Sequence, residues 1–355
     1  MTQRAAALHA GEWQGVFYVT GGGASLLAEL LNTPGASGTV LEASVPYAEA
    51  ALTELLGQKP AQACSETTAR QLAMRAYSRA KQLGEGTLFG FGVTASLATG
   101  RPKRGTHRAH WAIQTATCSR SFAATFNAER AAEEQLLLTY LWSSLRHCLM
   151  DPKYAMHPAV QAHQHQASPA WHPLLEEAPF RYCTDTHDGR LILPGSFNPQ
   201  HEGHRAMLAV AEQTTGLRGA YELAVRNADK PDLDFLSIAE RLRHIEDRPV
   251  WLTNTPTFED KARLFPGATF ALGVDTLARI GELRFYGGQA ERLQTALRTF
   301  VAQDVRFLVF GRLMGDRFVG LDDLDLPTRL KRRCRGIDEA VYRNDISSTQ
   351  IRQGR

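Results

Sequence analysis

The chain has 355 residues, of which 43% are hydrophobic and 22% are charged, so it is long enough for about two domains and too apolar to be disordered. Its 40 lysines and arginines nearly balance 37 aspartates and glutamates, giving a net charge of +3, so we expect no nucleic-acid partner. No apolar run approaches the roughly 18 residues of a membrane helix, so we expect no membrane partner either.

The cysteines and the first residues of the chain predict its compartment. The five cysteines are odd in number, far apart and without a CxxC pair, which argues against a disulfide framework or a zinc site. The first fifteen residues, MTQRAAALHAGEWQG, contain no apolar stretch typical of a secretory signal. We therefore expect a reducing, cytoplasmic location.

Residues 1–150 alternate short apolar stretches with amphipathic ones, which predicts a layered α/β domain. A strand over 16–19 runs into three glycines, and a helical pattern follows over 26–31. The same alternation predicts strands at 88–93 and 110–117 and helices at 47–56, 67–83 and 128–149.

Residues 151–189 differ from the rest in being rich in proline and histidine, which predicts a connector with a short helix over 159–166. Four histidines, at 157, 163, 165 and 172, raise the alternative of a metal site. No acidic residue or cysteine stands at ligand spacing from them, so a polar loop is favoured and no metal site is predicted.

From residue 190 the alternation of strands and helices resumes, which predicts a second α/β domain over 190–355 with a parallel sheet. Strands are expected at 191–194, 220–225, 249–252, 269–272 and 305–310, and helices at 203–215, 237–247 and 292–303.

The segment 195–204, GSFNPQHEGH, lies between a predicted strand and a predicted helix. Gly195 allows a sharp turn, and the backbone N–H groups where a helix begins attract anions. His201 and His204 are three residues apart, so their imidazoles point to one side of the first helical turn. These features favour a phosphate-binding site over an ordinary loop with two exposed histidines.

The segment 346–352, ISSTQIR, places three hydroxyl residues before a short helical pattern. Hydroxyls at that place cap a helix and can also donate to a phosphate, and Arg352 adds a cation suited to phosphate oxygens. By itself the segment is better explained as a plain capped helix with an exposed arginine.

Taken together, these two segments resemble the HxGH and ISSTxIR signatures of the nucleotidylyltransferase superfamily, which includes nicotinamide and nicotinate mononucleotide adenylyltransferases. The resemblance extends to residues 227–230 and to the strand end 272–275, and it covers about 190–355. It implies a Rossmann-like domain in which His201, His204 and Arg352 are catalytic. It further implies nucleotide contacts at Gly195, Ser196, Phe197, Ser347, Ser348 and Thr349, and substrate contacts at Lys230 and Asp275.

Residues 15–145 resemble the CinA C-terminal domain, whose active members are nicotinamide-nucleotide amidases. The resemblance lies in the segments 26–37, 47–57 and 92–105. Counted from these segments, Thr20 stands at the position of the nucleophilic serine and Leu52 at that of the lysine base, and only Tyr47 is retained. A hydroxyl without a base is not activated, so a scaffold, ligand-sensing or homo-oligomerisation role is favoured over an amidase.

The expected function is transfer of an adenylyl, or another nucleotidyl, group from a nucleoside triphosphate to a phosphate-bearing acceptor. Nicotinamide or nicotinate mononucleotide is the favoured acceptor, which implies NAD biosynthesis. ATP is the expected co-substrate, and Mg²⁺ is expected to arrive with the triphosphate. Two alternatives are a non-catalytic nucleotide-binding regulator and an amidase acting through the N-terminal domain.

Overall fold

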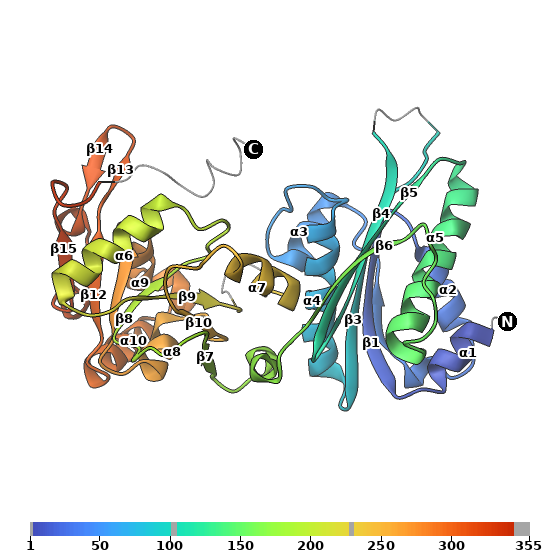
Figure 1. Ribbon diagram of the computed structural model, residues 1–355, viewed down its shortest axis with the longest axis horizontal. Helices are drawn as coiled ribbons and strands as arrows, with labels where there is room; N and C mark the ends of the chain where they lie inside the picture. The colour runs from blue at the N-terminus through green and yellow to red at the C-terminus, as the bar shows by residue number, and fades with distance from the viewer. Residues whose placement is uncertain (1–2, 101–104, 227–230, 344–355) are drawn as a thin grey trace. The chain divides into compact units, whose positions relative to one another are not determined.

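The computed structural model describes residues 3–100, 105–226 and 231–343 and divides into two compact units. Unit 1 contains the chain up to His172 together with a short segment that ends at Ile238, and unit 2 contains the rest. Each unit is built from helices and strands around its own sheet, which confirms the predicted α/β class (Figure 1). In the described part of the chain no helix is both long and apolar enough to cross a membrane.

Unit 1 is built on a six-stranded mixed sheet in the order β2-β1-β3-β4-β5-β6. The first three of these strands are parallel, and the strands from β3 to β6 are antiparallel. The strands are β1 (Trp13–Thr20), β2 (Val40–Ser44), β3 (Thr87–Ser96), β4 (His107–Thr115), β5 (Cys118–Phe126) and β6 (Gln161–Gln166).

Helices cover both faces of this sheet, because its inner strands carry apolar side chains on both sides. On one face Phe17, Phe91 and Trp111 pack with α1, α2 and α5. On the other face Val16 and Tyr18 pack with α3 and α4. The helices are α1 (Gln3–His9), α2 (Ala24–Leu31), α3 (Glu49–Leu56), α4 (Glu66–Leu83) and α5 (Arg130–Leu145) (Figure 1).

The stretch predicted as a connector, 151–189, contributes a strand to each sheet. The helix predicted over 159–166 is wrong: Gln161–Gln166 form β6, which pairs antiparallel with β5. Five of the six β6 residues are exposed, and the strand carries no apolar alternation, so its sequence gives no strand pattern. Main-chain pairing at the edge of the sheet determines its conformation.

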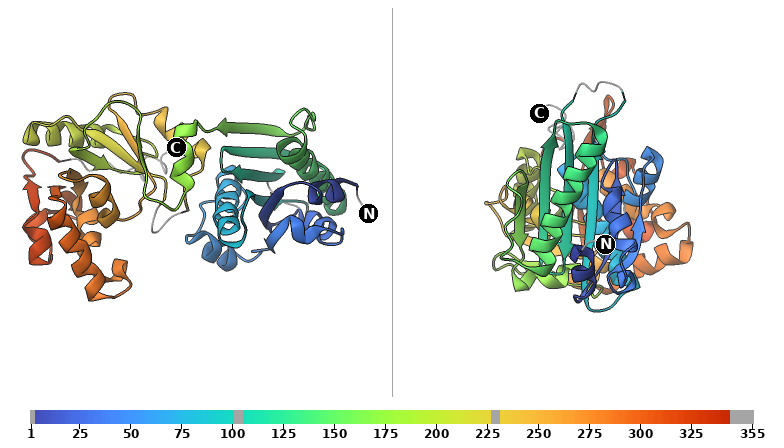
Figure 2. Two further views of the ribbon diagram at one scale, coloured as in Figure 1. Left: turned by 90° about the horizontal axis from the view of Figure 1, so that it is seen from below. Right: turned by 90° about the vertical axis from the view of Figure 1, so that its right-hand side faces the viewer.

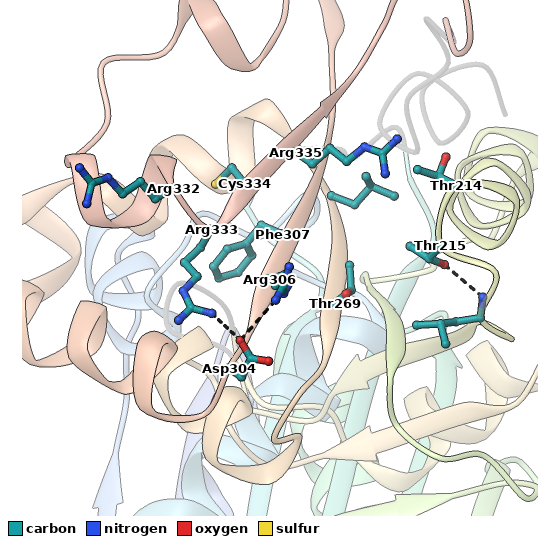
Figure 3. A pocket seen from close by; sticks show the side chains of 12 residues that line it. Thr214, Thr215, Thr269, Asp304, Arg306, Phe307, Arg332, Arg333, Cys334 and Arg335 are labelled. Carbon is teal, nitrogen blue, oxygen red and sulfur yellow. Dashed lines mark hydrogen bonds and ion pairs between the residues drawn. The ribbon is translucent and has the colours of Figure 1, made fainter.

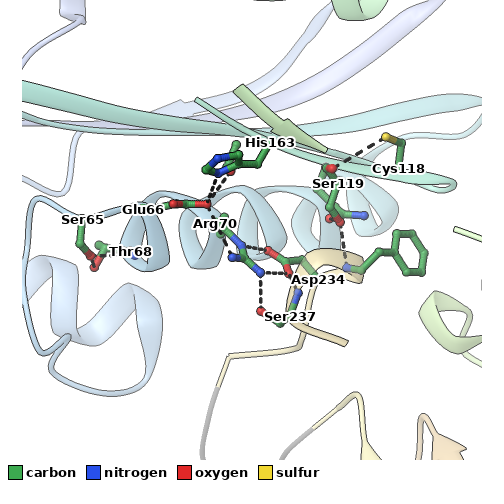
Figure 4. A network of polar contacts seen from close by, with 12 residues as sticks. Ser65, Glu66, Thr68, Arg70, Cys118, Ser119, His163, Asp234 and Ser237 are labelled. Carbon is green, nitrogen blue, oxygen red and sulfur yellow. Dashed lines mark hydrogen bonds and ion pairs between the residues drawn. The ribbon is translucent and has the colours of Figure 1, made fainter. Parts of the chain in front are cut away.

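A buried ion pair fixes residues 231–238 within unit 1 (Figure 4). The Arg70 guanidinium on α4 donates to both carboxylate oxygens of Asp234 at 2.7 Å, and both side chains are less than one-tenth exposed. Arg70 also donates to Ser237 Oγ at 2.8 Å, and the Phe235 N–H donates to Ser119 Oγ on β5 at 2.8 Å. The two parallel hydrogen bonds and the additional partners offset the free-energy cost of removing both charges from water.

Unit 2 contains a seven-stranded sheet in the order β15-β12-β11-β8-β9-β10-β7, in which only β7 is antiparallel to its neighbour. After the edge strand β7, the chain enters the central β8, moves out to β9 and β10, and returns to add β11, β12 and β15 on the other side. This is the doubly wound order of a Rossmann-like domain. The strands are β7 (Arg181–Cys183), β8 (Leu191–Pro194), β9 (Ala220–Ala224), β10 (Val250–Thr253), β11 (Thr269–Gly273), β12 (Arg306–Phe310) and β15 (Cys334–Ile337).

The helices of unit 2 pack on this sheet through a core rich in phenylalanine. Phe265, Phe270, Phe300 and Phe307 join residues of β11 and β12 to α8, α9 and α10. The helix α6 packs on β8 and β11, and its yellow-green ribbon can be followed in Figure 2. The helices are α6 (Glu202–Thr215), α8 (Phe258–Leu264), α9 (Val274–Gly281), α10 (Ala290–Ala302) and α11 (Thr328–Lys331), with a small hairpin of β13 (Arg312–Met314) and β14 (Arg317–Val319). The helix α7 (Phe235–Leu242) begins in the short segment of unit 1 and ends in unit 2.

Candidate functional site

The candidate site lies at the carboxyl ends of β8 and β11, the two neighbouring strands from which the chain winds in opposite directions. In doubly wound sheets the crevice at this reversal is where ligands bind. Residues 195–204 leave β8 here and enter α6, and Asp275 follows β11 at the same edge. The topology therefore places two of the segments singled out in the sequence at one edge of the sheet.

The turn after β8 depends on a glycine and on a buried aromatic ring. A Cβ added to Gly195 would lie 2.6 Å from Cζ of Phe197, and Phe197 has a φ of 44°. The Phe197 ring is buried and packs edge-on against both Tyr221 and His204, with ring centroids 5.0 Å apart in each case. The Gly195 N–H donates to Glu222 O at 2.9 Å, so that group belongs to the sheet and is no free donor for a nucleotide.

The imidazoles of His201 and His204 lie against each other where α6 begins, with their planes tilted by 33°. His201 is the N-cap residue, and its backbone N–H donates to Nδ1 of His204 at 3.3 Å. The two ring centroids are 3.8 Å apart. The expectation that both side chains lie on one side of the turn is therefore confirmed.

The same hydrogen bond determines the tautomer of His204. Because Nδ1 accepts a backbone proton, the neutral ring carries its own proton on Nε2 and offers an N–H donor there. Burial, with a smaller contribution from neighbouring His201, lowers the pKa of His204 from 6.5 to about 4. Burial also lowers the pKa of His201. Both rings are therefore neutral hydrogen-bonding groups near pH 7, rather than cations, in the free protein.

His201 carries an unsatisfied polar atom. Its Nδ1 is buried and has no hydrogen-bond partner among the described residues. A buried nitrogen of this kind costs free energy unless a ligand or water pairs with it. The pair of imidazoles therefore offers hydrogen-bonding capacity to a bound molecule.

The neutrality of His204 can be measured directly. We expect its imidazole nitrogen signals in a ¹⁵N NMR titration of the full chain to stay those of the neutral Nε2–H tautomer from pH 8 to pH 5.5, because burial disfavours the charged ring. The His204→Asn variant, which lacks these signals, supplies the assignment. A midpoint above pH 6 would contradict the buried geometry.

The hydroxyl-rich segment itself, with Ser347, Ser348, Thr349 and Arg352, lies outside the described residues, as does Lys230. The chain leading to that segment is described, and it reaches the candidate site. Tyr342 is buried and donates its hydroxyl to Gly203 O at 3.0 Å, and its ring packs edge-on against Phe310 at the end of β12. Tyr342 stands five residues before Ser347, and five extended residues span at most about 18 Å.

The remaining predicted residue, Asp275, lies in the first turn of α9 and forms an ion pair with Arg312. Sequence reasoning missed two residues of this site, Tyr342 and Arg241. The Arg241 guanidinium on α7 donates to Ser196 O at 2.9 Å and so brings a positive charge to the turn after β8. No sequence pattern around either residue points to the site, because each residue contacts this part of the chain only in the folded structure.

The glycine turn of unit 1 is occupied by the protein itself. Both oxygens of the Glu134 carboxylate accept from the Gly23 N–H at 2.9 Å, and Glu134 also accepts from Ser25. The Thr20 hydroxyl donates to Pro46 O at 3.0 Å, and Leu52 is buried in the core. An internal carboxylate thus fills the place that a phosphate would take, which favours a structural role for this turn.

Comparison with known proteins agrees with the architecture of unit 2. Residues 192–354 match the Cytidylyltransferase-like family. No curated protein matches the chain. The match covers the doubly wound sheet of the C-terminal half and supports a nucleotidyltransferase activity in general.

Proposed function

We propose that the cytidylyltransferase-like domain at residues 192–354 transfers an adenylyl group from ATP to nicotinamide or nicotinate mononucleotide and releases pyrophosphate. The acceptor is chosen because both halves of the sequence resemble families that act on pyridine mononucleotides. The alternative donor is CTP, in which case a cytidylyl group would be transferred in place of an adenylyl group. This activity belongs to NAD biosynthesis and fits a cytoplasmic protein.

The observation that carries the proposal is the hydrogen bond from Tyr342 to Gly203. It fixes the chain five residues before Ser347 against the turn that bears His201 and His204. This tether supports the proposal that two segments about 145 residues apart in the sequence bind one triphosphate. A capped terminal helix with no shared ligand would not require this buried tether.

In the proposed reaction, an oxygen of the acceptor phosphate attacks the α-phosphorus of the triphosphate in line. A new P–O bond forms as the bond from the α-phosphorus to the bridging oxygen breaks, and pyrophosphate leaves with that electron pair. The attacking phosphate is already ionised, so no protein base is needed. The His204 Nε2–H and the unpartnered nitrogen of His201 would hydrogen-bond the triphosphate, and Arg352 would stabilise the charge that develops on the leaving group.

The donor set of the protein suits a metal that arrives with its substrate. Within the described ranges, no group of three or more histidines, cysteines or acidic residues is arranged to hold a metal ion. Mg²⁺ keeps most of its water and binds phosphate oxygens readily, so we propose that it enters as the magnesium salt of ATP. When bound there, it neutralises charge on the triphosphate.

The test is pyrophosphate release by the full chain with Mg²⁺, either ATP or CTP, and a panel of phosphorylated acceptors. We expect release that matches, mole for mole, a dinucleotide detected by mass spectrometry, with ATP and a pyridine mononucleotide as the best pair. The matched control is His204→Asn under the same conditions. Binding of ATP without pyrophosphate release from any pair would instead support the non-catalytic regulator.

For unit 1 we propose a scaffold role, including homo-oligomerisation, rather than an amidase. The internal contacts of Thr20 and Glu134 support this choice. Ammonia release from nicotinamide mononucleotide that is abolished in Thr20→Ala would contradict it.

A further inference from the structure

A polar pocket in unit 2 lies at the opposite end of the sheet from the candidate site. It has a volume of about 650 Å³ and is formed where β11, β12 and β15 begin and α6 ends. Arg306 at the start of β12 lines this pocket, whereas Phe310 at the end of the same strand packs on Tyr342 at the candidate site. Five strand residues span about 17 Å, so the two sites are separated by the length of the sheet.

The pocket has a strong excess of positive charge. Arg306, Arg332, Arg333 and Arg335 line it, against the single carboxylate of Asp304, which leaves a formal excess of three charges. Arg333 donates to Asp304 Oδ1 at 2.6 Å, and Arg306 lies 3.7 Å from the same oxygen (Figure 3). The guanidinium groups of Arg332 and Arg335 form no ion pair or hydrogen bond within the part of the chain that is described.

Hydroxyls and apolar side chains complete the lining. Thr214 and Thr269 line the pocket, and their hydroxyls have no hydrogen-bond partner among the residues described. In Figure 3, Thr214 and Arg335 lie at one side of the pocket, while Arg306 and Arg333 converge on Asp304. Leu217, which is half-buried, adds an apolar side chain to the lining, whereas Phe307 and Leu308 are almost fully buried and expose little surface.

We propose that this pocket binds a small phosphorylated organic molecule distinct from the two substrates of the candidate site. Guanidinium groups with neighbouring hydroxyls are suited to phosphate oxygens, and the half-buried side chain of Leu217 offers an apolar contact to the carbon skeleton that carries the phosphate. A pocket of this volume has the size of a small-molecule site. A ligand at the amino ends of the strands cannot meet atoms at their carboxyl ends, so it acts as an effector and not as a reactant.

The test is isothermal titration calorimetry of the full chain with pyrophosphate. We expect this probe to bind at both sites, because each site is proposed to recognise its ligand through phosphate oxygens. We expect two binding events in the wild type. Arg335→Gln, and separately Arg306→Gln, should weaken one event about tenfold or more and leave the other unchanged. Arg335 is exposed and has no partner to lose among the described residues, so this variant is not expected to disturb folding.

Two controls separate this proposal from the proposed function. Arg329→Gln removes an exposed arginine of α11 that does not line the pocket, and it should leave both events unchanged. His204→Asn should weaken only the event that is insensitive to Arg335. If Arg335→Gln and Arg306→Gln both titrate like the wild type, the pocket is no phosphate site. Tighter, Arg335-dependent binding of a DNA or RNA duplex than of pyrophosphate would overturn the proposal in favour of a nucleic-acid surface.

Discussion

Replacing His204 with asparagine is expected to lower turnover by about 100-fold or more in the nucleotidyl-transfer assay, because the variant removes the Nε2–H that the structure aims away from the backbone. Asparagine keeps an oxygen near the position of Nδ1, so it can still accept from the His201 N–H. The measurement is kcat and kcat/KM for pyrophosphate release by variant and wild type, with the melting temperature of each.

A His204→Ala variant would be less informative than His204→Asn, because it changes more than the contact with the triphosphate. The His204 ring packs on buried Phe197 and accepts the N-cap hydrogen bond of α6, so His204→Ala also removes packing and a backbone partner. His204→Gln is the complementary variant, because its amide can place a donor near Nε2 while giving up the acceptor at Nδ1. Turnover retained in Asn and lost in Gln would show that the residue acts by shaping the turn and not by contacting phosphate.

Replacing Arg70 with methionine is expected to destabilise unit 1 by about 3–5 kcal/mol, since it leaves the Asp234 carboxylate buried without a cation. Urea unfolding followed by fluorescence gives the free energy of unfolding. Hydrogen exchange of α4 assigns the transition to this unit. The double variant Arg70→Met with Asp234→Asn should recover part of the loss, because no uncompensated charge remains. A loss below about 1 kcal/mol in the single variant would contradict this account of the pair.

The pH dependence of the same pair has a definite sign. Burial on its own raises the pKa of Asp234, but hydrogen bonds and attraction from Arg70 outweigh it and hold the pKa below its ordinary value. The stabilisation is therefore complete above the unfolded pKa of roughly 4 and is lost as pH falls through the lower native value. The difference between wild type and Arg70→Met should accordingly shrink as the solution is acidified below about pH 4.

The elements that the sequence predicts well are those whose signal is local. The strand at 305–310 and the helix at 203–215 have continuous apolar or helical patterns, and they are found as β12 and α6 with shifts of about one residue at their ends. The HxGH turn is equally local, because its spacing alone brings two imidazoles to one side of a helix. Such features need no knowledge of distant parts of the chain.

The elements that the sequence misses are stabilised by partners far along the chain. β5 carries the buried Ser119 and Ser121, whose hydroxyls form hydrogen bonds with the Phe235 N–H and the Glu66 carboxylate in place of the usual apolar contacts. Its sequence therefore lacks the alternation of apolar and polar residues by which a strand is predicted. Arg241 and Tyr342 at the candidate site were missed for the same reason, since only the folded sheet brings them to the turn after β8.

The short segment that ends at Ile238 determines how this protein can be divided for experiments. A fragment that starts near residue 190 would retain Asp234 and Phe235 but lose the guanidinium and the serine hydroxyl that pair with them. Buried polar groups that have lost their partners favour misfolding and aggregation. An inactive fragment of this kind would therefore not show that the protein lacks nucleotidyl-transfer activity. The two halves therefore need to be expressed as one polypeptide. Point substitutions, rather than truncations, are the way to remove the function of either half.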